Sequence, residues 1–413
     1  MKLLIAIPAL NEEESIAPII RRTLDARAEI LACTAVMAVD VIVISDGSTD
    51  RTVERARAFE PAVTVIVFDQ NRGYGAAIME AWRQSDAELL GFLDADGTCD
   101  PRFFVDLCHA ILQRNVDMAL GSRLHPLSRM PLTRRIGNIG FALLLTALGS
   151  TRVRDSASGM RVVRRDCLPR LMPLPDGLHF TPAMSARAIL ARDVAVEEVQ
   201  MPYNERTGRS KLRPFRHAWP FARVILGAAI LYRPSRLLGL LSLVAFAAAL
   251  FWTARLAWQV SRFGTFETWM IYHFVVIQLS TTAGVLLATA GYLGRKAVAI
   301  TLSSDARLWR PRGPVGTLLA HRGFWLVPTA LVVLGSAAVA PAALDRIATG
   351  FIDPATHHWS RFFAMSFAFS LAFILASARL INITLDLLAE RVAFLRSGVG
   401  ISSDTAARGS SIS

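Results

Sequence analysis

Residues 89–96 read LLGFLDAD, five uncharged residues followed by two aspartates with one alanine between them. A run of this length is typical of a strand buried on both faces of a parallel sheet. Similar runs come earlier in the chain, and helical stretches separate them, which predicts right-handed crossovers and a doubly wound, mostly parallel sheet of the α/β fold class. The expected strands are residues 3–7, 41–45, 63–68 and 89–93, and the expected helices are residues 13–31, 52–59 and 75–84.

A cluster of polar residues follows each expected strand. These clusters are residues 8–14, 46–50, 69–75 and 94–100. In doubly wound sheets, ligands bind beyond the carboxyl ends of the strands. The sequence therefore predicts a ligand site at this edge of the sheet.

Asp94 and Asp96 are the candidate metal ligands of that site. In an extended backbone, residues two apart point the same way, so both carboxylates can face one ion. Mg²⁺ and Mn²⁺ prefer carboxylate oxygens together with water and the phosphates of a ligand. An acidic pair at the start of a loop is more often a solvated turn, so the pair alone does not decide the chemistry.

Two loops next to this pair carry further candidates. Asp46 could accept a hydrogen bond from the edge of a nucleotide base, or it could cap the turn and helix that follow it. Gly73 and Gly75 open a helix and permit a ligand to approach the backbone closely. The chain has neither a GxGxxG dinucleotide fingerprint at this place nor a GxxxxGK[ST] phosphate loop, which argues against an NTPase.

Beyond residue 237 the sequence becomes a series of apolar runs. Four of them, residues 237–254, 269–293, 323–344 and 362–378, approach or exceed the ~20 residues that a bilayer span needs. The linker between the second and third runs carries six basic residues, against two in each of the other linkers. By the positive-inside rule, that linker and the N-terminal domain lie in the cytoplasm.

The formal charge of +12 is compatible with nucleic-acid binding, but many basic residues lie beside the apolar runs. That placement favours anionic lipid headgroups, so we expect a membrane and no nucleic acid as a partner. The four cysteines show no metal-ligand spacing and are expected to be reduced thiols.

The composition predicts five segments. A cytoplasmic α/β domain covers residues 1–215, and within it residues 131–150 form an interfacial helix, with a buried helix as the alternative. A juxtamembrane interfacial helix covers residues 216–236, an all-α transmembrane domain residues 237–390, and a disordered tail residues 391–413.

Four motifs in order, at residues 7–13, 45–50, 71–77 and 94–96, resemble those of family 2 glycosyltransferases. The resemblance covers roughly the first 215 residues and implies the GT-A fold. It further implies that Asp94 and Asp96 hold Mg²⁺ or Mn²⁺ against the donor diphosphate. The residues implied to bind the nucleotide sugar are Pro8, Asn11, Glu12, Asp46 and Gly73, together with Asp94.

A narrower resemblance, to dolichyl- and undecaprenyl-phosphate sugar synthases, rests on residues 121–123, 131–135, 155–161 and 202–212. It implies that Arg123 and Arg134 bind the acceptor phosphate and, with Asp96, form the catalytic set. For Arg134 a contact with a lipid headgroup is the alternative. Arg206 and Lys211 are implied to close over the donor diphosphate.

The resemblance implies transfer of a sugar from a GDP- or UDP-sugar to a polyprenyl phosphate, with inversion, by an integral membrane protein of the bacterial inner membrane. A phosphate monoester is already ionised near neutral pH, so we assign no catalytic base. A lipid hydroxyl acceptor and a non-catalytic nucleotide-sugar-binding scaffold stay open as alternatives. The sequence also leaves open which sugar is transferred and whether the chain forms a homo-oligomer.

Overall fold

The computed structural model describes residues 1–124, 128, 130–149, 154–191, 193–206, 214–264, 267–302, 311, 313–351 and 358–396. Lys211 and most of the expected disordered tail lie outside these residues. The chain divides into two compact units, Met1–Tyr232 and Arg233–Ser413.

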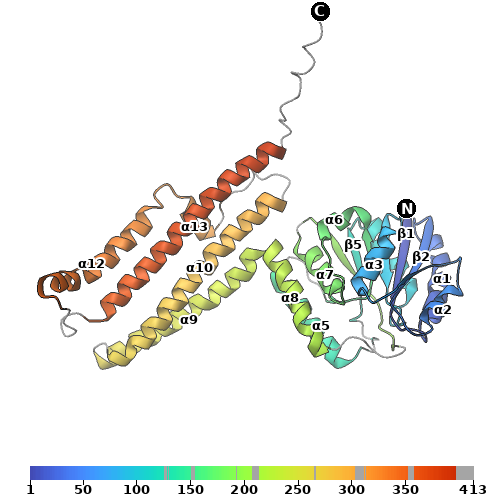
Figure 1. The fold of residues 1–413 in the computed structure, drawn as a ribbon, viewed down its shortest axis with the longest axis horizontal. Coiled ribbons are helices and arrows are strands. Elements are labelled where there is room, and N and C mark those ends of the chain that lie inside the picture. The colour runs from blue at the N-terminus through green and yellow to red at the C-terminus, as the bar shows by residue number, and fades with distance from the viewer. Residues whose placement is uncertain are drawn as a thin grey trace, which may run out of the picture. The chain divides into compact units, whose positions relative to one another are not determined.

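The first unit is built on a seven-stranded sheet with the strand order β3-β2-β1-β4-β6-β5-β7. Figure 1 shows this sheet with its strands β1, β2 and β5 labelled. Strand β6 runs antiparallel to both of its neighbours, β4 and β5, while the remaining pairs are parallel. The predicted mostly parallel α/β sheet is therefore confirmed. The strands are β1 (Lys2–Ala9), β2 (Ala38–Asp46), β3 (Thr64–Phe68), β4 (Leu89–Leu93), β5 (Met118–Ser122), β6 (Met160–Arg164) and β7 (Val196–Gln200).

Helices cover both faces of this sheet. Successive strand residues point to opposite sides, so apolar side chains lie on both faces and need helices to bury them. On β1, Ile5 belongs to the apolar core that includes residues of α1 and α4, while Leu4 belongs to the core with residues of α3 and α7. The helices are α1 (Ile16–Cys33), α2 (Thr52–Arg57), α3 (Tyr74–Arg83), α4 (Phe104–Gln113), α6 (Leu168–Leu171) and α7 (Phe180–Leu190), with short 3-10 turns η1 (Pro101–Phe103) and η2 (Arg165–Cys167).

Strand β6 brings a late segment of the chain to the edge formed by the carboxyl ends of the parallel strands, where the ligand site is predicted. Leu93, the last residue of β4, pairs with Met160, the first residue of the antiparallel β6. The residues before Met160 therefore lie beside the residues that follow β4. The end of β5 reaches the same edge, since Leu120 pairs with Arg161 near the start of β6. The residues after β4 and β5 and those before β6 thus converge at this edge.

Two further helices belong to the first unit, α5 (Leu132–Leu148) and α8 (Pro214–Tyr232). They contact each other through the rings of Phe141 and Phe221, whose centroids are 6.0 Å apart. Large apolar side chains of both helices are exposed, among them Ile136 and Trp219. That exposure is compatible with the interfacial position predicted for these segments, which stays a prediction.

In the part of the second unit that the structure describes, the regular elements are all helices: α9 (Pro234–Phe263), η3 (Thr268–Met270), α10 (Ile271–Leu302), α11 (Gly313–Ala320), α12 (Leu326–Thr349) and α13 (Ser360–Arg396). Within the described residues, four helices are long and apolar enough to cross a membrane, and each overlaps one of the predicted runs. The third helix, α12, begins at Leu326, three residues after the expected start of its run. Helix α10 packs against α9 and α13, and α13 packs against α12. Because α13 continues to Arg396, residues 391–396 of the expected tail are helical.

Polar side chains connect the helices of the second unit. The Nζ of Lys296, which is 1% exposed, donates hydrogen bonds to the carbonyl and side-chain oxygens of Asn382 at 2.9 and 2.7 Å and pairs with Asp386 at 2.6 Å. These contacts satisfy the ammonium group and fasten α10 to α13.

Candidate active site

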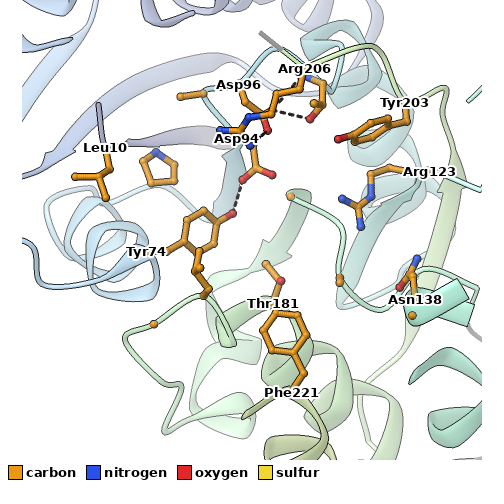
Figure 2. A pocket seen from close by; sticks show the side chains of 18 of the residues that line it. Leu10, Tyr74, Asp94, Asp96, Arg123, Asn138, Thr181, Tyr203, Arg206 and Phe221 are labelled. Carbon is orange, nitrogen blue, oxygen red and sulfur yellow. Dashed lines mark hydrogen bonds and ion pairs between the residues drawn. The ribbon is translucent and has the colours of Figure 1, made fainter. Parts of the chain in front are cut away.

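A cavity of about 680 Å³ opens at the carboxyl edge of the sheet in the first unit (Figure 2). Its lining residues come from the loops after β1 to β5 and after β7, from the segment before β6, and from α3, α5, α7 and α8. Eight of the predicted site residues line it: Pro8, Glu12, Asp46, Gly73, Asp94, Asp96, Arg123 and Arg206.

Arg206 bridges two carboxylates at one end of this cavity. Its Nη1 donates to Oδ2 of Asp96 at 2.7 Å, and its Nη2 donates to Oε1 of Glu12 at 2.8 Å. The other oxygen of Asp96 accepts hydrogen bonds from the backbone N–H and the hydroxyl of Thr98. Asp96 is therefore held by its own loop on one side and by a cation on the other.

Asp94 lies next to this bridge and points toward the centre of the cavity (Figure 2). Its Oδ1 accepts a hydrogen bond of 2.6 Å from the hydroxyl of Tyr74. Its Oδ2 lies against Gly159, where an added Cβ would be only 1.7 Å away. Burial, followed by the charge of Asp96, raises the pKa of Asp94 to about 7. A bound cation or a hydrogen-bond donor close to Asp94 would favour the ionised form of its carboxyl group.

Tyr74 is held firmly in place by its surroundings. Its ring makes edge contacts with Phe92 and Phe180, with centroids 6.4 and 6.5 Å away. The neighbouring N–H of Gly75 donates to the carbonyl of Asp176 at 2.5 Å. The hydroxyl of Tyr74 is thus fixed against Asp94 by packing on one side and by the backbone on the other.

Asp46 organises a loop at the cavity wall. Its Oδ1 accepts from the N–H of Arg72 at 2.6 Å, and its Oδ2 accepts from the N–H of Gly73 at 3.0 Å. Gly73 has a φ of 111°, and a Cβ there would be 2.4 Å from the carbonyl of Asp176, so only glycine fits. Asp46 thus fixes the loop before α3 and does not cap the helix α2 that follows it in the chain, whose N-cap is Arg51. A contact of Asp46 with a base stays a prediction.

Arg123 faces the cavity from the end of β5 (Figure 2). Its Nε and Nη2 donate to the two carboxylate oxygens of Asp155 at 2.7 and 2.9 Å, and its backbone N–H donates to Asp155 at 2.9 Å. The ring of Tyr203 lies 5.8 Å from the guanidinium carbon. Burial alone raises the pKa of Asp155, but the charge and hydrogen bonds of Arg123 bring it below its ordinary value.

The other end of the cavity is apolar. Here α5 and α8 form the wall, and two glycines of α5 leave space, because a Cβ on Gly137 or Gly140 would meet nothing within 4 Å. The cavity therefore joins a charged end to an apolar end, with Arg123 among its lining residues. The apolar wall is made by Met130, Phe141, Leu144, Leu178, Ala218 and Phe221.

The remaining predicted residues lie elsewhere or are not fully described. Asn11 is not among the residues that line the cavity, and its Oδ1 accepts a hydrogen bond from the N–H of Thr49 at 2.8 Å. Only the backbone of Arg134 is described, in α5, and Lys211 lies outside the described residues. The roles of these two residues stay predictions.

Sequence reasoning did not assign Tyr74 or Asp155, although both lie within motifs that the sequence displays. Each acts on a residue far along the chain, 20 positions away for Tyr74 and Asp94 and 32 positions away for Asp155 and Arg123. A buried Asp with a nearby buried Arg can be recognised only once the strand order is known.

The donor atoms present fit a divalent cation that a ligand helps to hold. Among the described residues there is no group of three or more His, Cys, Asp or Glu side chains that could hold a metal ion. Asp94 and Asp96 supply two carboxylates at the cavity wall, and Mg²⁺ commonly takes one or two carboxylates together with substrate phosphates and water. A metal ion held by these two carboxylates would take its remaining ligands from water or from phosphate oxygens of a ligand.

Comparison with known proteins gives the family. A profile described as "Glycosyl transferase family 2" matches residues 4–171. A dolichyl-phosphate hexose transferase of Haloferax volcanii is 32% identical over 225 residues, which cover 52% of this chain and 87% of that protein. A low-salt glycan biosynthesis hexosyltransferase, Agl6, of the same organism is 31% identical over 54% of this chain, but the match spans only 52% of that protein.

Among solved structures, the glucosyl-3-phosphoglycerate synthase of Mycobacterium tuberculosis in complex with Mn²⁺, UDP-glucose and phosphoglyceric acid is similar, with a TM-score of 0.44. It is 20% identical, and the match covers 55% of this chain and 79% of that one.

Proposed function

Because this chain belongs to glycosyl transferase family 2, we propose that it transfers a sugar from a nucleoside diphosphate sugar to the phosphate of a polyprenyl phosphate. One observation carries the proposal: a single cavity joins the carboxylates Asp94 and Asp96 to an apolar wall of α5 and α8, and Arg123 also lines it. A donor diphosphate suits the first end, a lipid chain suits the second, and a guanidinium suits a phosphate.

The donor would bind where Asp94, Asp96 and Arg206 meet. A divalent cation, Mg²⁺ or Mn²⁺, would supply charge neutralisation for the diphosphate as the bond to the sugar breaks. Asp94 and Asp96 would hold it, and Arg206 can exchange its two carboxylate partners for phosphate oxygens. The nearby loop that Asp46 fixes leaves the backbone of Gly73 exposed to the nucleotide sugar.

The acceptor phosphate would lie at Arg123. The second pKa of a phosphate monoester is about 6, so the acceptor phosphate is largely ionised at neutral pH. One of its oxygens can therefore attack the anomeric carbon without a general base. The protein then contributes position and charge, which is what a fixed arginine supplies. The apolar wall of α5 and α8 would take the first isoprene units of the lipid.

The charge of the linkers indicates on which side of the membrane the first unit lies. The linker after α10 carries the highest basic charge among the loops of the second unit, which by the positive-inside rule is cytoplasmic. We therefore propose that the first unit works at the cytoplasmic face, in a bacterial inner membrane. Inversion at the anomeric carbon is proposed from the family resemblance alone.

The test uses the full chain purified in detergent with Mn²⁺ or Mg²⁺. A panel of GDP- and UDP-sugars is offered with undecaprenyl or dolichyl phosphate, and lipid products are read by mass spectrometry. A glycosyl phospholipid is expected that disappears in Asp96→Ala and on chelation of the metal, but persists in Asp106→Ala, which removes an exposed carboxylate of α4. Donor turnover without any glycosylated lipid phosphate would instead favour a hydroxyl acceptor. Donor binding without turnover would favour a non-catalytic scaffold.

A further inference from the structure

We propose that Asp155 is a positioning residue for the transfer, which fixes the guanidinium of Arg123 in the orientation that holds the acceptor phosphate. The inference rests on the proposed function, because Arg123 is important here as the group that binds that phosphate. Asp155 does not line the cavity, so it would act on the substrate only through Arg123.

The contact between the two residues determines both the place and the plane of the guanidinium. Asp155 is 0% exposed and takes Nε and Nη2 of Arg123 on separate oxygens, which is the bidentate fork geometry. It also accepts from the backbone N–H of Arg123. Nη1 is not used in this fork, and Tyr203 lies over the guanidinium. Three hydrogen bonds from one residue to one carboxylate leave that side chain little freedom to rotate.

Asp155 is itself fixed from several sides. Its backbone N–H donates to Oε1 of Glu198 at 2.9 Å, and its Oδ1 accepts from the N–H of Ala157. Arg161, also 0% exposed, donates to the carbonyls of Ser156 and Ser158 at 3.0 and 3.2 Å. The carboxylate that binds Arg123 is therefore itself held in a fixed position, which a positioning role requires.

The same segment reaches the donor end of the cavity. The carbonyl of Gly159 accepts the backbone N–H of Asp94 at 3.1 Å, and the α-carbon of Gly159 packs against that carboxylate. Residues 155–159 thus fix Arg123 at one end and Asp94 at the other. This arrangement sets the spacing between the group that binds the attacking phosphate and the group that binds the donor.

Removing the charge of Asp155 has opposite effects on phosphate binding by Arg123 and on the rate of transfer. Asp155→Asn leaves the positive charge of Arg123 without its counter-charge, so attraction for a phosphate is retained or strengthened. The fork that orients the guanidinium is lost, and misplacement of a reacting group by about 1 Å costs about a hundredfold in rate. The signature of positioning is therefore a fall in kcat without a rise in the KM of the acceptor.

The experiment measures transfer with the lipid phosphate varied at saturating donor, on the full chain in detergent. For Asp155→Asn we expect kcat to fall by about tenfold to a hundredfold, with the acceptor KM within about threefold of wild type. For Arg123→Lys we expect a similar fall in kcat, and the double variant should be no slower than Arg123→Lys, because Asp155 acts through Arg123. Asp117→Asn is the matched control, since Asp117 pairs with Arg170 at 2.8 Å away from the cavity.

A binding readout accompanies the kinetics. Titration calorimetry with farnesyl phosphate on the donor-free protein should give Asp155→Asn an affinity within about threefold of wild type, and Arg123→Gln a loss of about tenfold or more. Should Asp155→Asn not fold, Asp155→Glu keeps the charge, displaces the carboxylate by one methylene and should still lower kcat.

The outcomes separate a failure of the positioning role of Asp155 from a failure of the proposed function. A wild-type kcat in Asp155→Asn, effects of Asp155 and Arg123 that multiply, or an equal loss in Asp117→Asn would overturn the positioning role while transfer by the wild type stands. A wild type that neither binds farnesyl phosphate nor glycosylates a lipid phosphate would overturn the proposed function, and the positioning role with it.

Discussion

Nη1 of Arg206 donates a hydrogen bond to Oδ2 of Asp96 at 2.7 Å, so a cation of the chain lies against the carboxylate that we expect to hold a divalent metal. The same guanidinium reaches Glu12 at 2.8 Å. A metal ion that binds Asp96 through this oxygen would lie close to the guanidinium of Arg206, and the two positive charges would repel each other. The diphosphate of the donor offers Arg206 an alternative partner, which links donor binding to metal binding.

Arg206→Gln should therefore raise the affinity of the donor-free protein for Mn²⁺, by about tenfold if the guanidinium occupies the site most of the time. Donor affinity should fall, because a cation that suits the diphosphate is lost. Electron paramagnetic resonance of free Mn²⁺ measures the first effect and nucleotide titration the second. The control is Arg102→Gln, which breaks a 2.7 Å pair with Asp100 outside the cavity. An unchanged Mn²⁺ affinity in Arg206→Gln would show that Arg206 does not compete with the metal.

Tyr74→Phe keeps the ring among Phe92 and Phe180 but removes the hydroxyl that donates to Asp94. A hydrogen bond to a charged group contributes about 1.5–3 kcal/mol, so we expect kcat/KM for the donor to fall by about tenfold to a hundredfold. Steady-state kinetics with the donor varied measures it. Tyr232→Phe removes a tyrosine hydroxyl that donates to the carbonyl of Arg170 instead, and should leave the kinetics unchanged. Equal effects in the two variants would contradict a specific role of the hydroxyl on Asp94.

The parallel half of the sheet and the edge that carries the site could be predicted because local pattern encodes them. The expected strand at residues 89–93 coincides with β4, and the polar residues directly after it line the cavity. Parallel strands bring their carboxyl ends to one edge, so no long-range information was needed to gather Pro8, Asp46, Asp94 and Asp96.

The pairings within the site could not be predicted in this way. Arg123 meets Asp155 only because β6 runs antiparallel between β4 and β5, and no local feature of residues 160–164 gives their direction. The contact between Tyr74 and Asp94 depends on the angle at which α3 leaves its loop, which the carbonyl of Asp176 fixes from a segment about a hundred residues later. Local periodicity carries no information on contacts of that range.

The ion pair of Asp155 should make the stability of the protein depend on pH in the acid range. The folded pKa of Asp155 lies below its ordinary value, so the contribution is fully present above the unfolded pKa of about 4 and is lost as the pH falls through the folded pKa. The difference in Tm between wild type and Asp155→Asn should be constant from about pH 8 to pH 5 and should narrow toward pH 3. Thermal unfolding in detergent measures it. A difference that stays constant to pH 3 would show that the charge of Asp155 does not stabilise the fold.

Gly159→Ala tests the packing that holds Asp94. An ideal Cβ at Gly159 would lie 1.7 Å from Oδ2 of Asp94 and 2.2 Å from its Cγ, so the carboxylate must rotate out of its place. Because the carbonyl of Gly159 also accepts the N–H of Asp94, the backbone cannot withdraw without breaking that hydrogen bond. We expect donor and Mn²⁺ binding to weaken by about tenfold or more, as for removal of a group that orients a metal ligand.

Gly137→Ala is the matched control for this substitution. Gly137 lines the same cavity from α5, but a Cβ there meets nothing within 4 Å, and alanine favours a helix more than glycine does. Calorimetry with the donor and Mn²⁺ should therefore separate the two variants, with Gly137→Ala close to wild type. Wild-type binding by Gly159→Ala would mean that Asp94 can leave its position without loss, and that the donor and the metal do not depend on the carboxylate orientation that Tyr74 and Gly159 impose.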